Sequence, residues 1–300
     1  MEGVEARIEQ VLSLADDQAG ERPDAATFSA LQSFRRFCLL ATATEAWATL
    51  AYFRDEESAP LHLAIALWLA ACTAIGWPRR FGRIATAAAA VGLGLQVVAV
   101  FPTAANHQVL AVLCLGLLAL PHPDEPAERE LVLRALRWLV VIGLFAAGLQ
   151  KLLFGYWLRG ELLAYAIWAR DSFAVFFQPL LAHDEWQRLR DLRPEAGAGP
   201  FLVDSPLLIA ISNATWLAEL VLPVLLLRRG TRRPAVVASI VYLTLIELGA
   251  RELFFGGLMV NLLLLFWPSD VVRRTLPIFA AAYFYLLLVM LGIAPHWEFR

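Results

Sequence analysis

Long apolar runs recur along this chain of 300 residues, and several of them contain few charged side chains. A helix of about 20 apolar residues crosses the ~30 Å hydrocarbon core of a bilayer. Hydrophobic residues make up 59% of the chain and charged residues 17%, whereas a soluble domain carries about 25% charge. Backbone groups inside a bilayer must bond to one another, which helices achieve within a single segment. We therefore predict an all-α fold, a polytopic integral membrane helical bundle.

Nine of the apolar runs are predicted to be membrane spans, with approximate bounds 37–53, 61–77, 84–100, 109–120, 135–154, 206–227, 235–250, 255–267 and 276–293. The predicted transmembrane domain covers residues 28–294. Residues 1–27 are predicted to be a cytosolic amphipathic segment with an acidic polar side, and residues 295–300 a C-terminal tail.

The arginines indicate the orientation of these spans. With the amino terminus in the cytoplasm, the short inner loops collect thirteen arginines and the outer loops and tail collect three, as the positive-inside rule requires. The inner set is Arg35, Arg36, Arg79, Arg80, Arg83, Arg129, Arg134, Arg228, Arg229, Arg232, Arg233, Arg273 and Arg274, and the outer set is Arg54, Arg251 and Arg300. We expect the active face to lie on the outer, extracytoplasmic side.

The segment 155–205 differs from an ordinary loop. Residues 158–168 and 171–181 are apolar and aromatic, but each run is too short to cross a bilayer. We expect short helices that lie in the outer interface or re-enter it, followed by an exposed polar turn at residues 184–199. These helices either cover a cavity for a lipid-like molecule, lined by Phe173 and Phe177, or only shield the bundle from lipid.

Lys151 is the only lysine in the chain, beside 24 arginines. Arginine stays charged, whereas a desolvated ammonium can lose its proton and act as a base. Lys151 is therefore the first candidate for a catalytic residue. The alternative is that it extends its ammonium to the lipid headgroups, beside the interfacial aromatics Tyr156 and Trp157.

Asn106 and His107 lie in the outer turn between the predicted third and fourth spans, on the same side as Lys151. Histidine can accept or donate a proton near neutral pH, so His107 is a candidate partner of Lys151, or else a residue that caps its helix. Acidic residues within the spans are costly and are paired or functional. Glu219 either has such a role or bonds to backbone freed by Pro223.

Three further carboxylates lie in or near predicted spans. Glu247 is predicted to pair with Arg251, while Glu45 and Glu252 receive no predicted role. The histidines and cysteines show no metal-ligand spacing, so no metal is expected. The net charge of -2 argues against a nucleic-acid partner.

Two motifs resemble a known family. The segment AGLQKLLFGYWLRGELL resembles a signature of vitamin K-dependent gamma-carboxylases and their bacterial HTTM-domain relatives, in Gly148, Lys151, Trp157 and Gly160. The segment NHQVLAVLCLGLLAL resembles a second signature, which opens on Asn106 and His107. The series Glu219, Pro223, Arg228 and the segment FWPSDVVRR are similar to the family too.

The resemblance implies a minimal carboxylase-like membrane enzyme that couples oxygenation and epoxidation of a quinol to proton abstraction and carboxylation. Its cofactors would be a reduced naphthoquinone with O2 and CO2. Lys151 and His107 would be catalytic. The expected quinol-binding residues are Asn106, Trp157, Gly148, Gly160, Glu219, Phe173 and Phe177.

The chain departs from the family in two respects. The family often has a histidine in the seventh span, where this chain reads Tyr242, Leu243, Thr244. The animal enzyme carries a large lumenal domain for its protein substrate, and we expect a partner protein to supply that domain here. The alternative function is a non-enzymatic membrane scaffold, or a lipid- or quinone-binding subunit of a larger complex.

Overall fold

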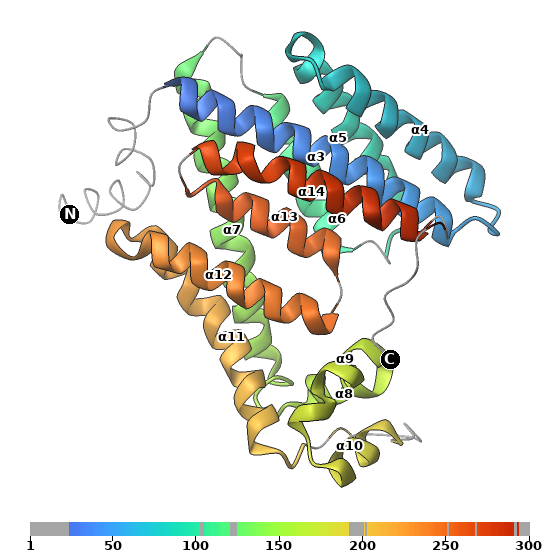
Figure 1. Cartoon of the computed structure of the whole chain (residues 1–300), viewed down its shortest axis with the longest axis vertical. Coiled ribbons are helices and arrows are strands. Elements are labelled where there is room, and N and C mark those ends of the chain that lie inside the picture. Colours follow the sequence, from blue (N-terminus) through green and yellow to red (C-terminus); the bar gives the residue numbers. More distant parts are fainter. Residues whose placement is uncertain are drawn as a thin grey trace. The chain divides into compact units, whose positions relative to one another are not determined.

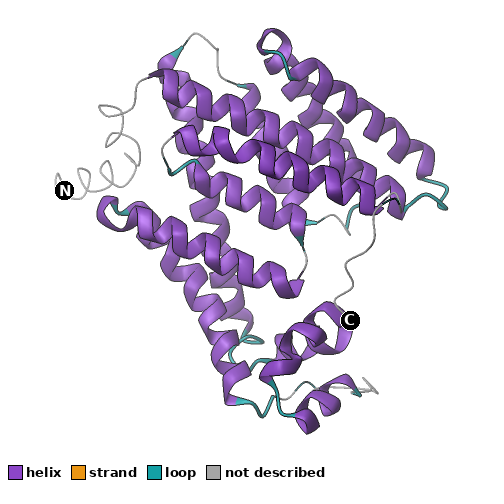
Figure 2. Cartoon of the chain, viewed as in Figure 1, coloured by secondary structure: helices purple, strands orange, loops and turns teal. Residues whose placement is uncertain are grey.

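A computed structural model of the chain describes residues 24–102, 105–120, 125–191, 201, 203–250, 252–267, 269–290 and 293. Residues 1–23 of the predicted amphipathic segment lie outside these ranges, as does the tail predicted for residues 295–300. Every regular element in the described ranges is a helix, which confirms the all-α prediction (Figure 2).

The chain divides into two compact units, which are described separately. The first unit comprises residues 1–139 and 257–298, and the second comprises residues 140–256. The chain passes from one unit to the other within α7 (Pro126–Phe154) and returns within α13 (Leu253–Leu264).

The first unit is built around α3 (Asp24–Tyr52), which packs against α14 (Ser269–Met290) and α4 (Ala59–Gly76) (Figure 1). Its remaining elements are η1 (Arg79–Phe81), α5 (Gly82–Ala99) and α6 (Asn106–Ala119). The Phe37 ring lies on the buried face of α3 and contacts the rings of Phe279 and Tyr283 on α14, each at 5.6 Å between centroids. These aromatic contacts hold the first and last described helices together.

A fully buried arginine joins two helices of the first unit. Arg137 on α7 donates from Nε and Nη2 to the carbonyl oxygen of Leu265, at 3.1 and 2.8 Å, just past the end of α13. Its guanidinium also lies 5.5 Å from the centre of the Phe266 ring. A cation at a helix C-terminus satisfies carbonyls that have no partner within the helix.

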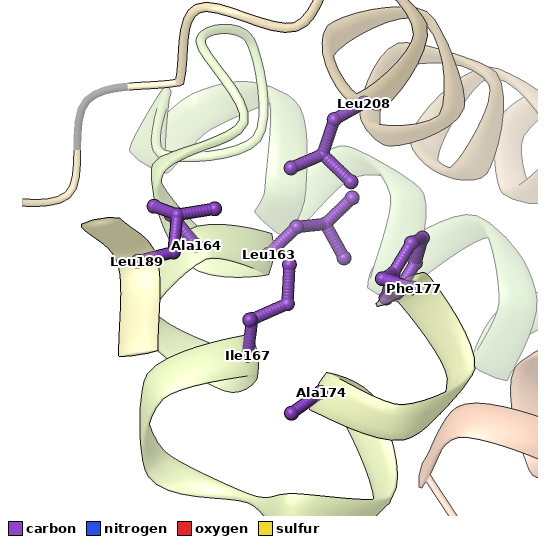
Figure 3. Close-up of a cluster of buried hydrophobic side chains, with 7 residues drawn as sticks. All are labelled: Leu163, Ala164, Ile167, Ala174, Phe177, Leu189 and Leu208. Carbon is purple, nitrogen blue, oxygen red and sulfur yellow. The ribbon is translucent and has the colours of Figure 1, made fainter. Parts of the chain in front are cut away.

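The second unit contains two long helices, α11 (Pro206–Leu227) and α12 (Arg229–Ala250), which pack against each other. Between α7 and α11 the chain forms α8 (Glu161–Ala169), α9 (Asp171–Phe177), η2 (Gln178–Leu180) and α10 (His183–Arg190). Buried side chains of α8, α9, α10 and α11 form one hydrophobic core, which includes Leu163, Ile167 and Phe177 (Figure 3).

Short helices are therefore present where the sequence predicted them, between residues 158 and 181. The exposed turn predicted for residues 184–199 is wrong over its first part, because residues 183–190 form α10. Leu189 explains the difference, since its side chain is fully buried in the core beside α8. The burial of this one leucine gives a charged segment an apolar face.

Six helices are long and apolar enough to cross a membrane, namely Ala59–Gly76, Arg79–Ala99, Pro126–Phe154, Pro206–Leu227, Arg229–Ala250 and Val271–Val289. They coincide with six of the nine predicted spans, and they confirm a membrane protein at this level. The other three predicted spans fall on α3 and on the shorter apolar helices α6 and α13, and they stay predictions.

Candidate functional site

Lys151 lies in the last turn of α7 and is bound to a carboxylate of the same unit. Its Nζ lies 2.6 Å from both carboxylate oxygens of Glu219 on α11. The Lys151 side chain is 20% exposed and that of Glu219 is 7% exposed. Two charges this little exposed are stabilised by their mutual attraction, which is stronger away from water. The ammonium thus has an internal partner, and the two alternatives for Lys151, a base or a residue extended to the headgroups, stay predictions.

Two aromatic residues complete the surroundings of the pair. The Lys151 Nζ lies 5.0 Å from the centre of the Trp157 ring, within range of a cation–π interaction. The Tyr242 hydroxyl on α12 donates to Glu219 Oε1 at 2.8 Å, and it lies 3.3 Å from the Thr215 carbonyl oxygen. One carboxylate is thus shared by an ammonium and a phenol from two different helices.

Gly148 explains how α7 and α11 come close enough for this pair to form. A Cβ atom at Gly148 would lie 2.9 Å from Cβ of Glu219 and 3.0 Å from its backbone carbon. Residues three apart on a helix share a face, so the same face of α7 presents Gly148 and Lys151 to Glu219. The Gly-x-x-Lys spacing therefore combines a close helix contact with a charge placed one turn further along.

The short segment after α7 holds Trp157 in place. It begins and ends with Gly155 and Gly160, which both have φ of 73°, a left-handed conformation that favours glycine. The Ser212 hydroxyl of α11 donates to the Trp157 carbonyl at 2.6 Å, and Asn213 Nδ2 donates to the Leu158 carbonyl at 3.0 Å. Hydrogen bonds from side chains of α11 to the backbone carbonyls of this segment thus position the tryptophan beside the ammonium.

The predicted quinol-binding residues Phe173 and Phe177 lie on α9. Phe177 is buried in the hydrophobic core with Leu163, while Phe173 packs against that core and lies within van der Waals reach of Gly249 on α12. Their rings are stacked with centroids 6.2 Å apart. These contacts give both residues a role in packing α9, and their role in binding a quinol stays a prediction.

His107 belongs to the first unit and also binds a carboxylate. Its Nε2 lies 2.7 Å from Oε1 of Glu45 on α3, with the two side chains 17% and 8% exposed. No partner for Glu45 was predicted, and the structure shows that His107 is its partner. Asn106 is the first residue of α6 and is exposed. Because Lys151 and His107 lie in different units, the predicted meeting of the two stays a prediction.

The remaining acidic candidates have other surroundings. Glu252 forms an exposed ion pair with Arg170, at 3.4 Å. Glu247 lies so close to Gly256 that a Cβ atom there would be 2.6 Å from its carboxyl carbon. Its predicted partner Arg251 lies outside the described residues. No group of three potential metal ligands occurs among the residues that the structure describes.

Tyr242 is the member of this cluster that the sequence did not identify as functional. It was noted only because the family often has a histidine near this position. A phenol hydroxyl within an apolar helix is a signal in itself, because polar groups in membrane helices face the interior of the bundle.

No protein-family model, curated protein or solved structure matches the chain.

Proposed function

We propose that the chain is a quinol-dependent membrane enzyme, a minimal carboxylase-like protein whose base is Lys151. The observation that carries this proposal is the 2.6 Å contact between Lys151 Nζ and the little-exposed Glu219 carboxylate. Proton transfer across so short a contact leaves a neutral amine beside a neutral carboxylic acid. The amine can then take a proton from a hydroxyl group that is presented to it.

Each neighbour of Lys151 has a distinct part in this proposal. Glu219 accepts the ammonium proton, and Tyr242 stabilises the carboxylate by donating a hydrogen bond to Oε1. Trp157 stabilises the ammonium form through its ring and covers one side of the amine. The cluster can therefore hold a proton on either partner without a net change in charge, which keeps the cost of proton transfer low in an apolar site.

The residues around Lys151 fit the quinol that the family resemblance implies, because an acidic hydroxyl needs a nearby base and its ring needs apolar cover. A bound reduced naphthoquinone would supply, on reaction with O2, the strong base that abstracts a carbon-bound proton, after which CO2 is added. A role for His107 and Asn106 in this reaction is part of the proposal on the ground of the family resemblance alone. The expected partners are the lipid bilayer, the quinone and a protein that brings the substrate domain.

We also propose the finer membrane arrangement, with nine spans, a cytoplasmic amino terminus and an extracytoplasmic active face. The three additional spans would be α3, α6 and α13. Burial supports α3, because it packs among α4, α5, α6 and α14 and several of its buried polar side chains have partners within the first unit. Glu45 binds His107, and the Thr42 hydroxyl donates to the Cys38 carbonyl at 2.8 Å. A helix enclosed by others tolerates such residues within a membrane.

The test is epoxide formation from vitamin K quinol by the purified, reconstituted protein. We expect Lys151→Ala and Lys151→Arg both to abolish turnover, because neither side chain can accept the proton. Arg159→Gln is the matched control, since Arg159 is a nearby exposed cation. Turnover that survives Lys151→Arg would show that Lys151 is not the base.

The second candidate is a non-enzymatic quinone- or lipid-binding subunit. It is favoured by the contact of Nζ with both oxygens of Glu219, since an ammonium so fully paired also suits a structural role. Mass spectrometry of molecules extracted from the purified protein separates the two. A quinone that is retained equally by the wild type and by Lys151→Arg, without turnover in either, would support the subunit.

A further inference from the structure

Four arginines gather in the first unit where α3 lies against the junction between α4 and α5. They are Arg35 and Arg36 of α3 and Arg79 and Arg80 of η1, and together they are called the arginine cluster. Arg35 Nη2 donates to the Gly76 carbonyl and Arg36 Nε donates to the Trp77 carbonyl, each at 3.2 Å. These bonds attach the helix α3 to the segment that carries the other two arginines.

Arg35 is the most deeply placed member of the cluster. The residue is 5% exposed, and its Nε has no hydrogen-bond partner. Its guanidinium lies directly over Gly82, where a Cβ atom would be 1.6 Å from Nη1. Arginine is rarely this buried unless an anion pairs with it, because an isolated charge loses its hydration. The structure provides Arg35 with a single carbonyl instead.

No carboxylate offsets the charge of the cluster within the part of the chain that the structure describes, since no ion pair there includes Arg35, Arg36, Arg79 or Arg80. Arg35 lies outside the predicted span that begins at residue 37. Its burial first, and then the charges of Arg36 and Arg79, lower the pKa of its guanidinium to about 10. The cations therefore repel one another at a place where the carbonyls at the end of α4 accept from two of them and no described carboxylate pairs with any.

Aromatic rings take the place of acidic partners around the cluster. The Arg79 guanidinium lies 4.9 Å from the centre of the Phe28 ring, and that of Arg36 lies 5.4 Å from the Trp77 ring. Trp77 and Phe81 are themselves exposed. The cluster thus combines guanidinium groups with apolar surface, as the boundary between lipid headgroups and acyl chains does.

We propose that the arginine cluster binds a phosphate group, either that of an anionic phospholipid headgroup or a free phosphate. Guanidinium groups match phosphate oxygens with paired, charge-assisted hydrogen bonds, and the exposed Arg79 and Arg80 are such donors beside the buried Arg35. The cluster lies just before or after three predicted spans, which would place it at the depth of the headgroups. A bound phosphate would supply the negative charge that these four side chains lack. This site is independent of the function proposed for Lys151.

The experiment uses native mass spectrometry of the full-length protein, equilibrated with phosphatidylglycerol and phosphatidylcholine in equal amounts. The wild type should retain phosphatidylglycerol in preference to phosphatidylcholine. The variant Arg79→Gln/Arg80→Gln should lower this preference by at least about tenfold, which is the loss expected for one charge-assisted hydrogen bond. The control Arg228→Gln/Arg233→Gln removes the same charge from exposed arginines of the second unit that also belong to the predicted inner set, and it should lower the preference by much less.

A second pair of variants changes no charge and tests Arg35 itself. Gly82→Ala places a methyl group where the Arg35 guanidinium lies and should displace it, which lowers the preference several-fold. Gly94→Ala on the same helix is the matched control, because no atom beyond its own helix lies within 4 Å of that added Cβ. An equal effect of the two substitutions would remove Arg35 from the site and overturn the proposal.

The source of the phosphate is settled by competition with inorganic phosphate at constant ionic strength. Displacement of phosphatidylglycerol assigns the site to free phosphate, and resistance assigns it to the lipid; both support a phosphate site. Besides an equal effect of the two glycine substitutions, two results would overturn the proposal. These are no binding of either anion and an equal loss in the arginine control.

Discussion

A double-mutant cycle across Lys151 and Glu219 tests the ion pair on which the candidate site depends. Lys151→Met would leave a carboxylate that is 7% exposed with only the Tyr242 hydroxyl as a partner. Removing one member of a buried pair costs about 3–5 kcal/mol, because the other charge stays buried. Glu219→Leu would leave an ammonium that is 20% exposed and lies beside Trp157, so the expected loss is smaller, about 1–3 kcal/mol.

The double variant should be close to the wild type in stability. Hydrophobic side chains of similar volume replace a buried ion pair at little or no cost, so the two losses should not add. The coupling free energy is then the sum of the two single losses, about 4–8 kcal/mol. The assay is unfolding by sodium dodecyl sulfate in mixed micelles, followed by circular dichroism, with Arg159→Met as the control for an exposed cation. Additive losses, or a Lys151→Met variant as stable as the control, would refute the buried pair.

Three further substitutions test the packing around the site and the first unit. Gly148→Ala should reduce turnover, because its added methyl separates α7 from Glu219. The free energy of unfolding should fall by only about 0–2 kcal/mol. The control Gly143→Ala on the same helix should be neutral or stabilising by up to about 1 kcal/mol. Gly160→Ala should cost about 1–2 kcal/mol in the same unfolding assay, because an L-residue is strained at φ of 73°. Arg137→Met should cost about 1–3 kcal/mol, since it leaves the Leu265 carbonyl without its donor, and a melting temperature equal to the wild type would contradict this role.

Apolar runs carry most of the information about this fold, because a bilayer allows few alternatives to helices. They predicted the positions of the long helices well. They could not predict α10, where one buried leucine, Leu189, determines the helix. They also gave no account of Arg137, although a charge inside a predicted span is a signal that it lies in the bundle interior.

The candidate site was predictable as a set of residues and less so as a set of contacts. Lys151 and Glu219 were each identified from residue type and position, but their pairing joins helices 68 residues apart. Tyr242 and the Glu45–His107 contact were missed for the same reason, since long-range pairs leave no spacing in the sequence. Gly148 was identified only through the family resemblance, and its close approach to Glu219 is visible in the structure alone.

The attachment of the segment 151–157 to α11 has a mechanical consequence. Glu219 binds Lys151 at one end of this segment, and Ser212 binds the Trp157 carbonyl at the other. These two bonds hold the amine and the backbone of the tryptophan on α11. The Tyr242 hydroxyl reaches the same helix from α12, so a shift of α12 along α11 would lengthen its contacts with Glu219 and Thr215 and leave those of the amine in place.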